Sequence, residues 1–305
     1  MIEQPIESKY APYLALISVQ AFFGSLPVIG KVVLTVIPSF ALVGFRVGIT
    51  ALILFIFQSL RKRIWLEHRG DYWRLALLSL FGVTINQLLF IGGLSLTKAS
   101  NTSLLAVTIP IFTLAVSAIV GTEKLRLVKV IGIVLAAIGV IFLIDPRNAS
   151  FSSETTMGDI LIVLNSLSYG IYVATSKKTI TRNGAFRSMM WIFIFASVIC
   201  VPLGAFSLST IDINAVSPLI WWLVLYIAIV ATAAPYLFNA WALARVSAST
   251  VAVFIYLQPI IGFILAVIFL DEKIDLKFGV AAILVFTGVF LTIRKSPRID
   301  VHVTA

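Results

Sequence analysis

Long runs of apolar residues alternate with short polar breaks along the whole chain. The runs are about 20 residues long, the length at which an α-helix crosses the hydrocarbon core of a bilayer. They lack the short-period alternation typical of membrane β-strands. Because lipid cannot satisfy free backbone polar groups, the pattern predicts transmembrane helices. Ten are expected, over residues 11–31, 38–60, 73–95, 99–120, 127–144, 158–177, 187–206, 218–241, 247–270 and 276–293.

The composition favours the same class of protein. Hydrophobic residues make up 60% of the 305 and charged residues 12%, whereas a soluble domain is about half apolar and a quarter charged. The single cysteine, Cys200, cannot form an internal disulfide, and the two histidines, His68 and His302, lie in polar stretches. A metal-ligand cluster cannot be assembled from this set, and no cofactor is expected.

The basic residues predict the orientation of the chain. Of the 23 Lys and Arg residues, 17 lie on the side of the predicted N-terminus, five lie on the opposite side, and Arg46 lies within a helix. The positive-inside rule therefore places both termini in the cytoplasm, in a multi-pass protein of the inner (plasma) membrane. This distribution also explains the net charge of +10 without a nucleic-acid partner.

An internal repeat with an offset of 149 residues covers much of the chain. It aligns KASNTSLLAVTIPIFTLAVSAIVGTEKLRL, from Lys98, with SASTVAVFIYLQPIIGFILAVIFLDEKIDL, from Ser247, without a gap. The alignment pairs Pro110 with Pro259, and the first predicted helix of each copy matches at an offset of 146, with Gly24 on Gly170. Chance apolar matching does not account for paired Pro, Glu-Lys and Gly residues.

Each copy contains five predicted helices, an odd number, so the second copy must enter the membrane inverted. The expected fold is an all-α integral membrane protein of ten transmembrane helices arranged as two inverted five-helix repeats. We expect one repeat over 11–144, a linker over 145–157 and the second repeat over 158–293. Inverted repeats with a site between them are typical of transporters.

Three features connect the repeats to a known family. They are a fourth helix with a small residue four positions before its proline, a Gly-Thr-Glu-Lys or Asp-Glu-Lys that follows it, and a glycine-rich fifth helix. With these, residues 12–293 resemble two EamA domains of the drug/metabolite transporter superfamily. The resemblance implies a cavity lined by helices 1, 3, 4, 6, 8 and 9. It also implies export of amino acids or other small metabolites, while related branches carry nucleotide sugars and triose phosphates.

Polar side chains within apolar helices are the candidates for a substrate site, because each needs a partner in lipid. They gather on the same six helices that the resemblance implies. Aromatic residues near helix ends and single hydroxyls have simpler roles as interfacial anchors or backbone partners. The predicted substrate-binding residues are Gln20, Asn86, Asn101, Asn165, Tyr169, Tyr236, Asn239, Tyr256 and Gln258.

Five further residues are predicted to have gating or structural roles. Pro110 and Pro259 should interrupt their helices, and Glu123 and Glu272 should cap helices or contact gates at opposite membrane faces. For Arg46, a structural role, in which it snorkels outward or donates to backbone carbonyls of a neighbouring helix, is favoured over the alternative of balancing a substrate carboxylate. No acidic residue or histidine lies well inside a predicted helix, so we expect substrate binding to depend little on pH.

These observations favour an alternating-access transporter of small organic metabolites, and the resemblance implies an exporter of amino acids or related compounds. A nucleotide-sugar or sugar-phosphate antiporter is the alternative, although a diphosphate favours several basic cavity residues. A membrane-embedded enzyme is less favoured, because clustered acids, a metal site or a Ser/His pair are lacking. The expected partners are a small-molecule metabolite and the lipid bilayer, and a homodimer is left open.

Overall fold

The computed structural model describes residues 10–144, 155–261 and 276–293, and in these ranges every regular element is helical. Within these ranges, seven helices are long and apolar enough to cross a membrane. Three shorter apolar helices cover Leu127–Leu143, Ala248–Ile261 and Gly279–Ile293. The predicted all-helical, multi-span membrane fold is confirmed. The seven long helices span Ala11–Leu34, Ser39–Leu60, Arg69–Leu96, Asn101–Ile119, Thr156–Asn183, Ala185–Leu208 and Pro218–Leu243.

Two helices extend well beyond the apolar runs that predict them. The helix expected over 73–95 begins at Arg69, and the helix expected over 158–177 is α8 (Thr156–Asn183). Their polar ends stay helical because they bond to each other, since Arg182 and Asn183 both donate hydrogen bonds to the Asp71 carboxylate. Gly184, with a φ of 78°, then lets the chain turn directly into α9 (Ala185–Leu208).

The third and eighth predicted helices share an irregularity at equivalent positions. The first runs through α3 (Arg69–Ser79), the π-helical turn η1 (Leu80–Thr84) and α4 (Ile85–Leu96). The second runs through α10 (Pro218–Ala228), the π-helical turn η4 (Ile229–Ala233) and α11 (Ala234–Leu243). The two π turns are related by the same 149-residue offset as the sequence repeat. Such turns commonly occur at functional sites.

The helices that contain Pro110 and Pro259 are interrupted one turn before each proline. Proline removes an N–H donor and crowds the carbonyl four residues earlier, which is Ala106 in the first case. The chain accordingly divides into α5 (Ala99–Leu105) and α6 (Thr108–Ile119). In the second half, α12 (Ala248–Val253) tightens into the 3₁₀ turn η5 (Phe254–Tyr256) before Pro259. Residues 262–270 of this predicted helix, Glu272 and linker residues 145–154 lie outside the described residues.

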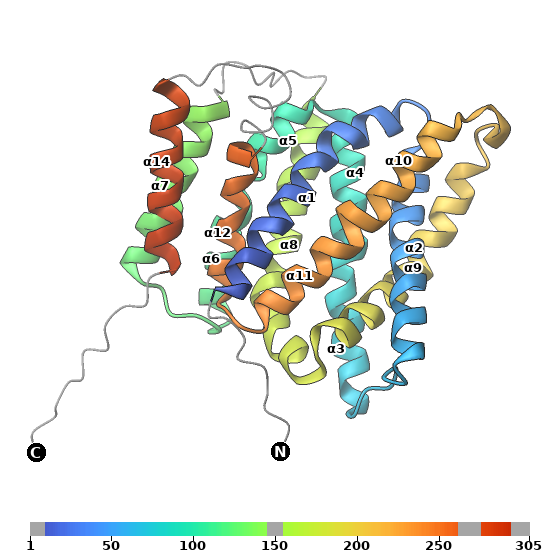
Figure 1. The fold of residues 1–305 in the computed structure, drawn as a ribbon, viewed down its shortest axis with the longest axis horizontal. Helices are drawn as coiled ribbons and strands as arrows, with labels where there is room; N and C mark the ends of the chain where they lie inside the picture. The colour runs from blue at the N-terminus through green and yellow to red at the C-terminus, as the bar shows by residue number, and fades with distance from the viewer. Residues whose placement is uncertain (1–9, 145–154, 262–275, 294–305) are drawn as a thin grey trace, which may run out of the picture.

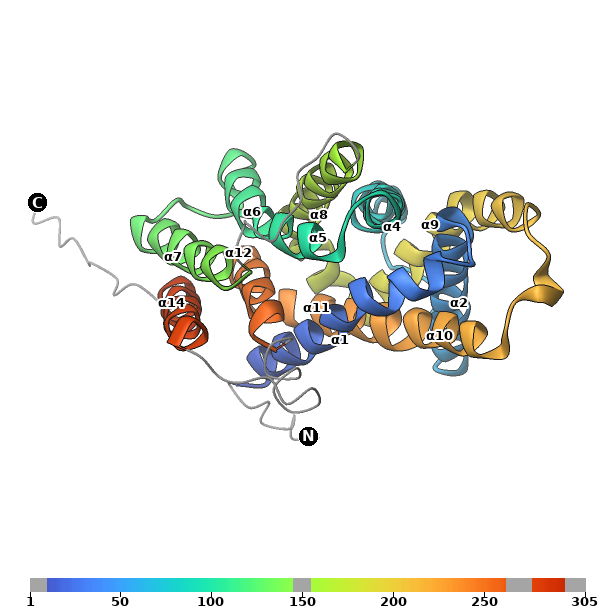
Figure 2. The same ribbon diagram turned by 90° about the horizontal axis from the view of Figure 1, so that it is seen from above.

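Two helix pairs form the opposite ends of the molecule (Figures 1 and 2). At one end α7 packs against α14, with Gly132 facing the backbone at Gly288. At the other end α2 packs against α9, where Gly44 meets Gly204. The remaining long helices lie between these ends and enclose the central cavity. The bounds not yet given are α1 (Ala11–Leu34), α2 (Ser39–Leu60), α7 (Leu127–Ile144), α14 (Leu276–Ile293) and the short 3₁₀ turn η3 (Ile213–Ala215).

Candidate functional site

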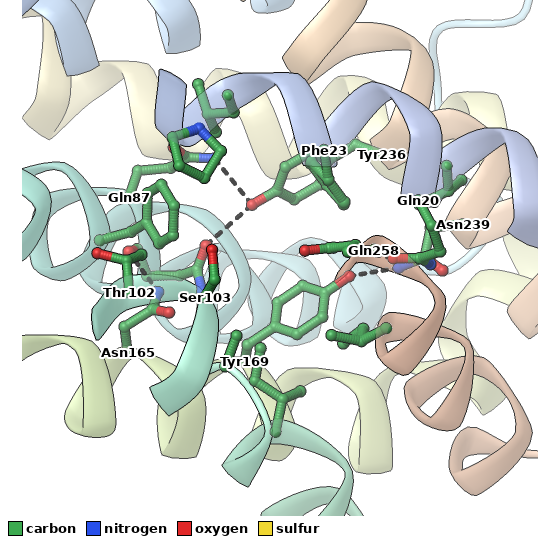
Figure 3. A pocket seen from close by; sticks show the side chains of 18 of the residues that line it. Gln20, Phe23, Gln87, Thr102, Ser103, Asn165, Tyr169, Tyr236, Asn239 and Gln258 are labelled. Atoms are coloured by element: carbon green, nitrogen blue, oxygen red, sulfur yellow. Dashed lines mark hydrogen bonds between the residues drawn. The ribbon is translucent and has the colours of Figure 1, made fainter. Parts of the chain in front are cut away.

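A cavity of about 90 Å³ lies between α1, α2, α4, α5, α6, α8, α11 and residues 251–258. Amides, hydroxyls and phenols from these elements turn toward one another around it (Figure 3), and apolar and aromatic side chains such as Phe23 and Phe90 complete its wall. Seven of the nine predicted substrate residues line the cavity. They are Gln20, Asn86, Asn165, Tyr169, Tyr236, Asn239 and Gln258.

The lining is built from equivalent positions of the two copies. Equivalent positions are 146 residues apart in the first helix of each copy and 149 residues apart elsewhere. In seven pairs of equivalent positions, both residues line the cavity. The pairs are Val19 with Asn165, Phe23 with Tyr169, Gln87 with Tyr236, Phe90 with Asn239, Thr102 with Val251, Ala106 with Ile255 and Ile109 with Gln258. The chemistry of most pairs differs, so equivalent positions of the two copies give the cavity an asymmetric polar lining.

Tyr236 is the centre of the hydrogen-bonded network beside η1. Gln87 Nε2 donates to its hydroxyl at 2.8 Å. The same hydroxyl lies 3.0 Å from Asn86 Oδ1 and 3.0 Å from the Gly82 carbonyl oxygen, both of which accept from it. Phe23 packs its ring edge-on against Tyr236 at a centroid distance of 5.9 Å. These contacts join α1, α4 and α11 around one phenol.

Asn165 and Tyr169 belong to α8 and connect it to both halves of the wall. Asn165 Nδ2 donates to the backbone oxygen of Asn86 at 2.8 Å. The Tyr169 hydroxyl accepts a short hydrogen bond from Asn239 Nδ2. Asn239 Oδ1 is buried without a hydrogen-bond partner. An orphaned amide oxygen is costly in an apolar environment, so the burial of this acceptor is not offset by a hydrogen bond in the described structure.

Gln20 and Gln258 close another part of the wall. Gln258 Nε2 donates to Gln20 Oε1 at 2.9 Å, which joins α1 to the residue before Pro259. Five lining residues, Gln258 among them, also border an adjoining cavity of about 260 Å³ that reaches Tyr256 and Pro259. The interrupted helix thus brings its polar residues to the cavities, as expected for broken helices in transporters.

Arg46 of α2 also reaches the main cavity. Its side chain is 1% exposed, and its Nε donates to Thr232 Oγ1 at 2.9 Å. Thr232 lies in the π turn η4, and its hydroxyl donates to the Ile227 carbonyl at 2.8 Å. Among the described residues, a side-chain hydroxyl therefore orients Arg46, and no hydrogen bond from it to a backbone carbonyl is seen there.

Asn101 and Tyr256 do not line the main cavity. Asn101 Nδ2 donates to the two carboxylate oxygens of Asp159 at 3.1 and 3.3 Å. Tyr256 donates to the Val107 carbonyl oxygen at 2.9 Å, across a gap of 149 residues. Pro110 is buried within α6, where it shapes the break and is not on the cavity wall. The structure thus assigns these groups to contacts between elements.

Glu123 joins the loop after α6 to the start of α12. One carboxylate oxygen accepts from the Ser249 backbone N–H at 2.9 Å, and the other accepts from the Ser249 hydroxyl at 2.7 Å and from Lys129 at 2.5 Å. Burial raises the pKa of Glu123, but the bonds from Lys129 and Ser249 outweigh it and hold the pKa below its ordinary value. The carboxylate is thus kept ionised between two parts of the chain.

Two buried carboxylates carry contacts that the sequence did not indicate. Asp159, near the start of α8, accepts from Thr97 at 2.6 Å as well as from Asn101. Asp71 is 1% exposed and bonds Arg182 and Asn183. Both residues lie at the edge of an apolar run, where a charged residue is ordinarily assigned to the aqueous boundary. Only the tertiary contacts show that these two carboxylates are buried and hydrogen-bonded.

Comparison with known proteins places these features among transporters. The model of the EamA-like transporter family matches residues 11–145 and 156–294. An uncharacterized transporter of Archaeoglobus fulgidus is 27% identical over 77% of this chain and 81% of its own length. The uncharacterized transporter YetK of Bacillus subtilis is 23% identical over 98% of this chain and 92% of its own.

Two further matches cover different shares of this chain. The threonine/homoserine exporter RhtA of Salmonella typhimurium is 28% identical over 181 residues, which cover 57% of this chain and 58% of that protein. A solved crystal structure superposes with a TM-score of 0.72 at 16% identity, and covers 93% of this chain and 96% of that one. At 16% identity, the match to this crystal structure shows a shared fold alone.

Proposed function

This chain belongs to the EamA-like transporter family, and on that premise we propose that it is an alternating-access exporter of amino acids or related small metabolites. It acts in the inner (plasma) membrane with both termini in the cytoplasm, as the 17-to-5 distribution of Lys and Arg predicts. Its moving units are the two inverted repeats over 11–144 and 158–293. Nucleotide-sugar or sugar-phosphate exchange is the alternative cargo class.

The observation that carries the proposal is the pseudo-symmetric wall of the cavity. Equivalent residues of both copies face the same space, and two hydrogen bonds, Gln87 to Tyr236 and Tyr256 to Val107, join positions that are equivalent at the offset of 149 residues. A site on such an axis is exposed to one membrane face or the other when the two copies exchange conformations. A cavity within one repeat would lack this property.

The chemistry of the wall supports a small organic cargo with apolar and hydrogen-bonding parts. Its polar groups are amides, phenols and hydroxyls, and Arg46 is the single basic residue that lines it in the described part of the chain. A nucleoside diphosphate needs several cations, so an amino acid fits better. The partial match to RhtA, named a threonine/homoserine exporter, points the same way. No carboxylate, histidine or cysteine lines the cavity in the described residues, so no chemical conversion of the cargo is proposed.

The test is flux in proteoliposomes that contain the purified protein and one radiolabelled amino acid at a time, with threonine and homoserine included. We expect saturable flux of at least one compound, and lower cellular accumulation of that compound when the protein is overproduced. Alanine replacement of Asn86, Asn165, Tyr169, Tyr236, Asn239 or Gln258 should weaken binding, because each loss of a buried hydrogen bond costs about 1–3 kcal/mol, or roughly 5- to 150-fold in affinity.

Asn214→Ala is the matched control, since Asn214 is exposed in η3. The Asn214→Ala variant should bind the transported amino acid with the same affinity as the wild type. Absence of flux for the whole panel would contradict amino-acid export. A twofold or smaller effect of all six cavity replacements would show that the cargo binds elsewhere.

A further inference from the structure

Arg46 carries a charge that the described protein does not neutralise. The side chain is 1% exposed, and no ion pair to it occurs in the part of the chain that the structure describes. In the described part of the chain, its one hydrogen bond runs from Nε to the neutral hydroxyl of Thr232. A charged side chain within a membrane helix is costly unless it pairs with an opposite charge. The group is therefore held in place by the protein but left without its electrostatic partner.

The guanidinium also has unused hydrogen-bonding capacity. Nη1 is buried and has no hydrogen-bond partner, while Arg46 as a residue lines the main cavity. Guanidinium presents its N–H groups as a planar fork that matches a carboxylate. Thr232 bonds only Nε and so fixes the direction of this fork without occupying it.

A second orphaned group lines the same cavity and has the opposite hydrogen-bonding character. Asn239 Oδ1 is a buried acceptor without a partner, and the Asn239 Nδ2 bond to Tyr169 fixes which end of the amide is free. Two residues of the cavity wall thus each hold one buried polar atom without a hydrogen-bond partner, a cationic donor in Arg46 and a neutral acceptor in Asn239. A ligand that completes both carries an anionic acceptor and a separate hydrogen-bond donor.

We infer that Arg46 binds the carboxylate of the transported molecule and that Asn239 Oδ1 accepts a hydrogen bond from an ammonium or hydroxyl group of the same molecule. The cargo class is accordingly a monocarboxylate with a nearby donor, such as an amino acid or a hydroxy acid. The inference rests on the proposed function, because it assigns roles within the transport cavity. One cation balances one carboxylate, which disfavours dianionic and diphosphate cargo.

The first experiment needs no variant and so does not depend on the folding of a mutant. Binding of threonine, homoserine, leucine and phenylalanine to the purified wild-type protein is compared with binding of the corresponding carboxamides, which lack the negative charge. We expect the carboxamide of any bound amino acid to bind about 10- to 100-fold more weakly, the range of a lost charge-assisted hydrogen bond. Equal affinities, within twofold, would overturn the inference.

The second experiment assigns the effect to Arg46. Arg46→Gln should lower the affinity for the amino acid to that for its carboxamide and leave the carboxamide affinity unchanged, while Arg46→Lys should retain part of the preference. Arg61→Gln is the matched control, because Arg61 lies at the exposed end of the same helix with its guanidinium over Phe57. Folded Arg46→Gln protein that keeps the full preference would overturn the assignment.

The inference and the proposed function fail in different ways. Flux of amino acids and their carboxamides at equal rates would leave the transporter intact and remove the carboxylate anchor. Lack of both binding and flux for every compound in the panel would remove amino-acid transport itself, and the anchor with it.

Discussion

Gln87 donates a 2.8 Å hydrogen bond to the hydroxyl of Tyr236, the residue that occupies its own equivalent position 149 residues later in the second copy. Equivalent positions of the two copies thus meet in a direct contact, and both residues line the cavity wall.

Tyr236→Phe should destabilise the protein by about 1–3 kcal/mol, because Gln87 loses its acceptor and Asn86 Oδ1 loses its donor in a buried site. The thermal unfolding midpoint of the purified protein measures the effect. Tyr13→Phe is the control, since the ring contact of Tyr13 with Phe254 does not need the hydroxyl. Equal midpoints for Tyr236→Phe and the wild type would contradict the structural role of this network.

The Glu123 contact should be independent of pH over the range from about 5.5 to 7.5. Its pKa in the folded protein is held below the ordinary value of about 4.3. Such a group stabilises the protein fully above the ordinary pKa and loses that contribution as the pH falls through the lowered one. The midpoint difference between wild type and Glu123→Gln should thus stay constant over that range and shrink below about pH 4.

The same reasoning extends to the cargo. We expect the affinity of an amino acid that does not itself titrate between about pH 5.5 and 7.5 to be unchanged over that range, because the cavity wall holds neutral groups and an arginine. A tenfold change would reveal a titratable group coupled to binding.

Cysteine labelling should report the predicted orientation. In a Cys200→Ala background, single cysteines at Arg63 and Lys178 should react with an impermeant reagent only from the cytoplasm, and one at Asn214 only from outside. All three positions are exposed, and Cys200 is buried, so its removal does not alter the labelled surface. Labelling of Asn214 from the cytoplasm alone would contradict the inverted arrangement of the repeats.

Gly44→Ala should destabilise the packing of α2 on α9. A Cβ at Gly44 would lie 2.9 Å from Gly204 Cα and 3.1 Å from the Cys200 carbonyl oxygen, both backbone atoms that cannot turn aside. Overpacking of this kind costs about 1–3 kcal/mol, which lowers the thermal midpoint. Gly279→Ala in α14 is the control, because a Cβ there meets nothing within 4 Å. An unchanged midpoint for Gly44→Ala would show that the two helices can separate freely.

The sequence by itself determined the helical, multi-span class of the fold, because hydrocarbon admits only backbones that satisfy their own hydrogen bonds. The helix predicted over 276–293 coincides with α14, and the interruptions near Pro110 and Pro259 follow from covalent chemistry that is local to each residue. Seven of nine predicted substrate residues also line the cavity, since a buried amide or phenol in lipid needs a partner wherever it lies.

The tertiary structure alone decided which of those polar groups are satisfied by the protein and which are left over. Asn101 is as polar as Asn239, yet its amide is bonded to Asp159 while Asn239 Oδ1 has no partner. Arg46 has the same charge as Arg182, which pairs with Asp71, whereas Arg46 meets only the hydroxyl of Thr232 in the described contacts. These partners are 58 to 186 residues apart in the chain and meet only through the packing of helices. A local sequence pattern therefore cannot predict which of them pair.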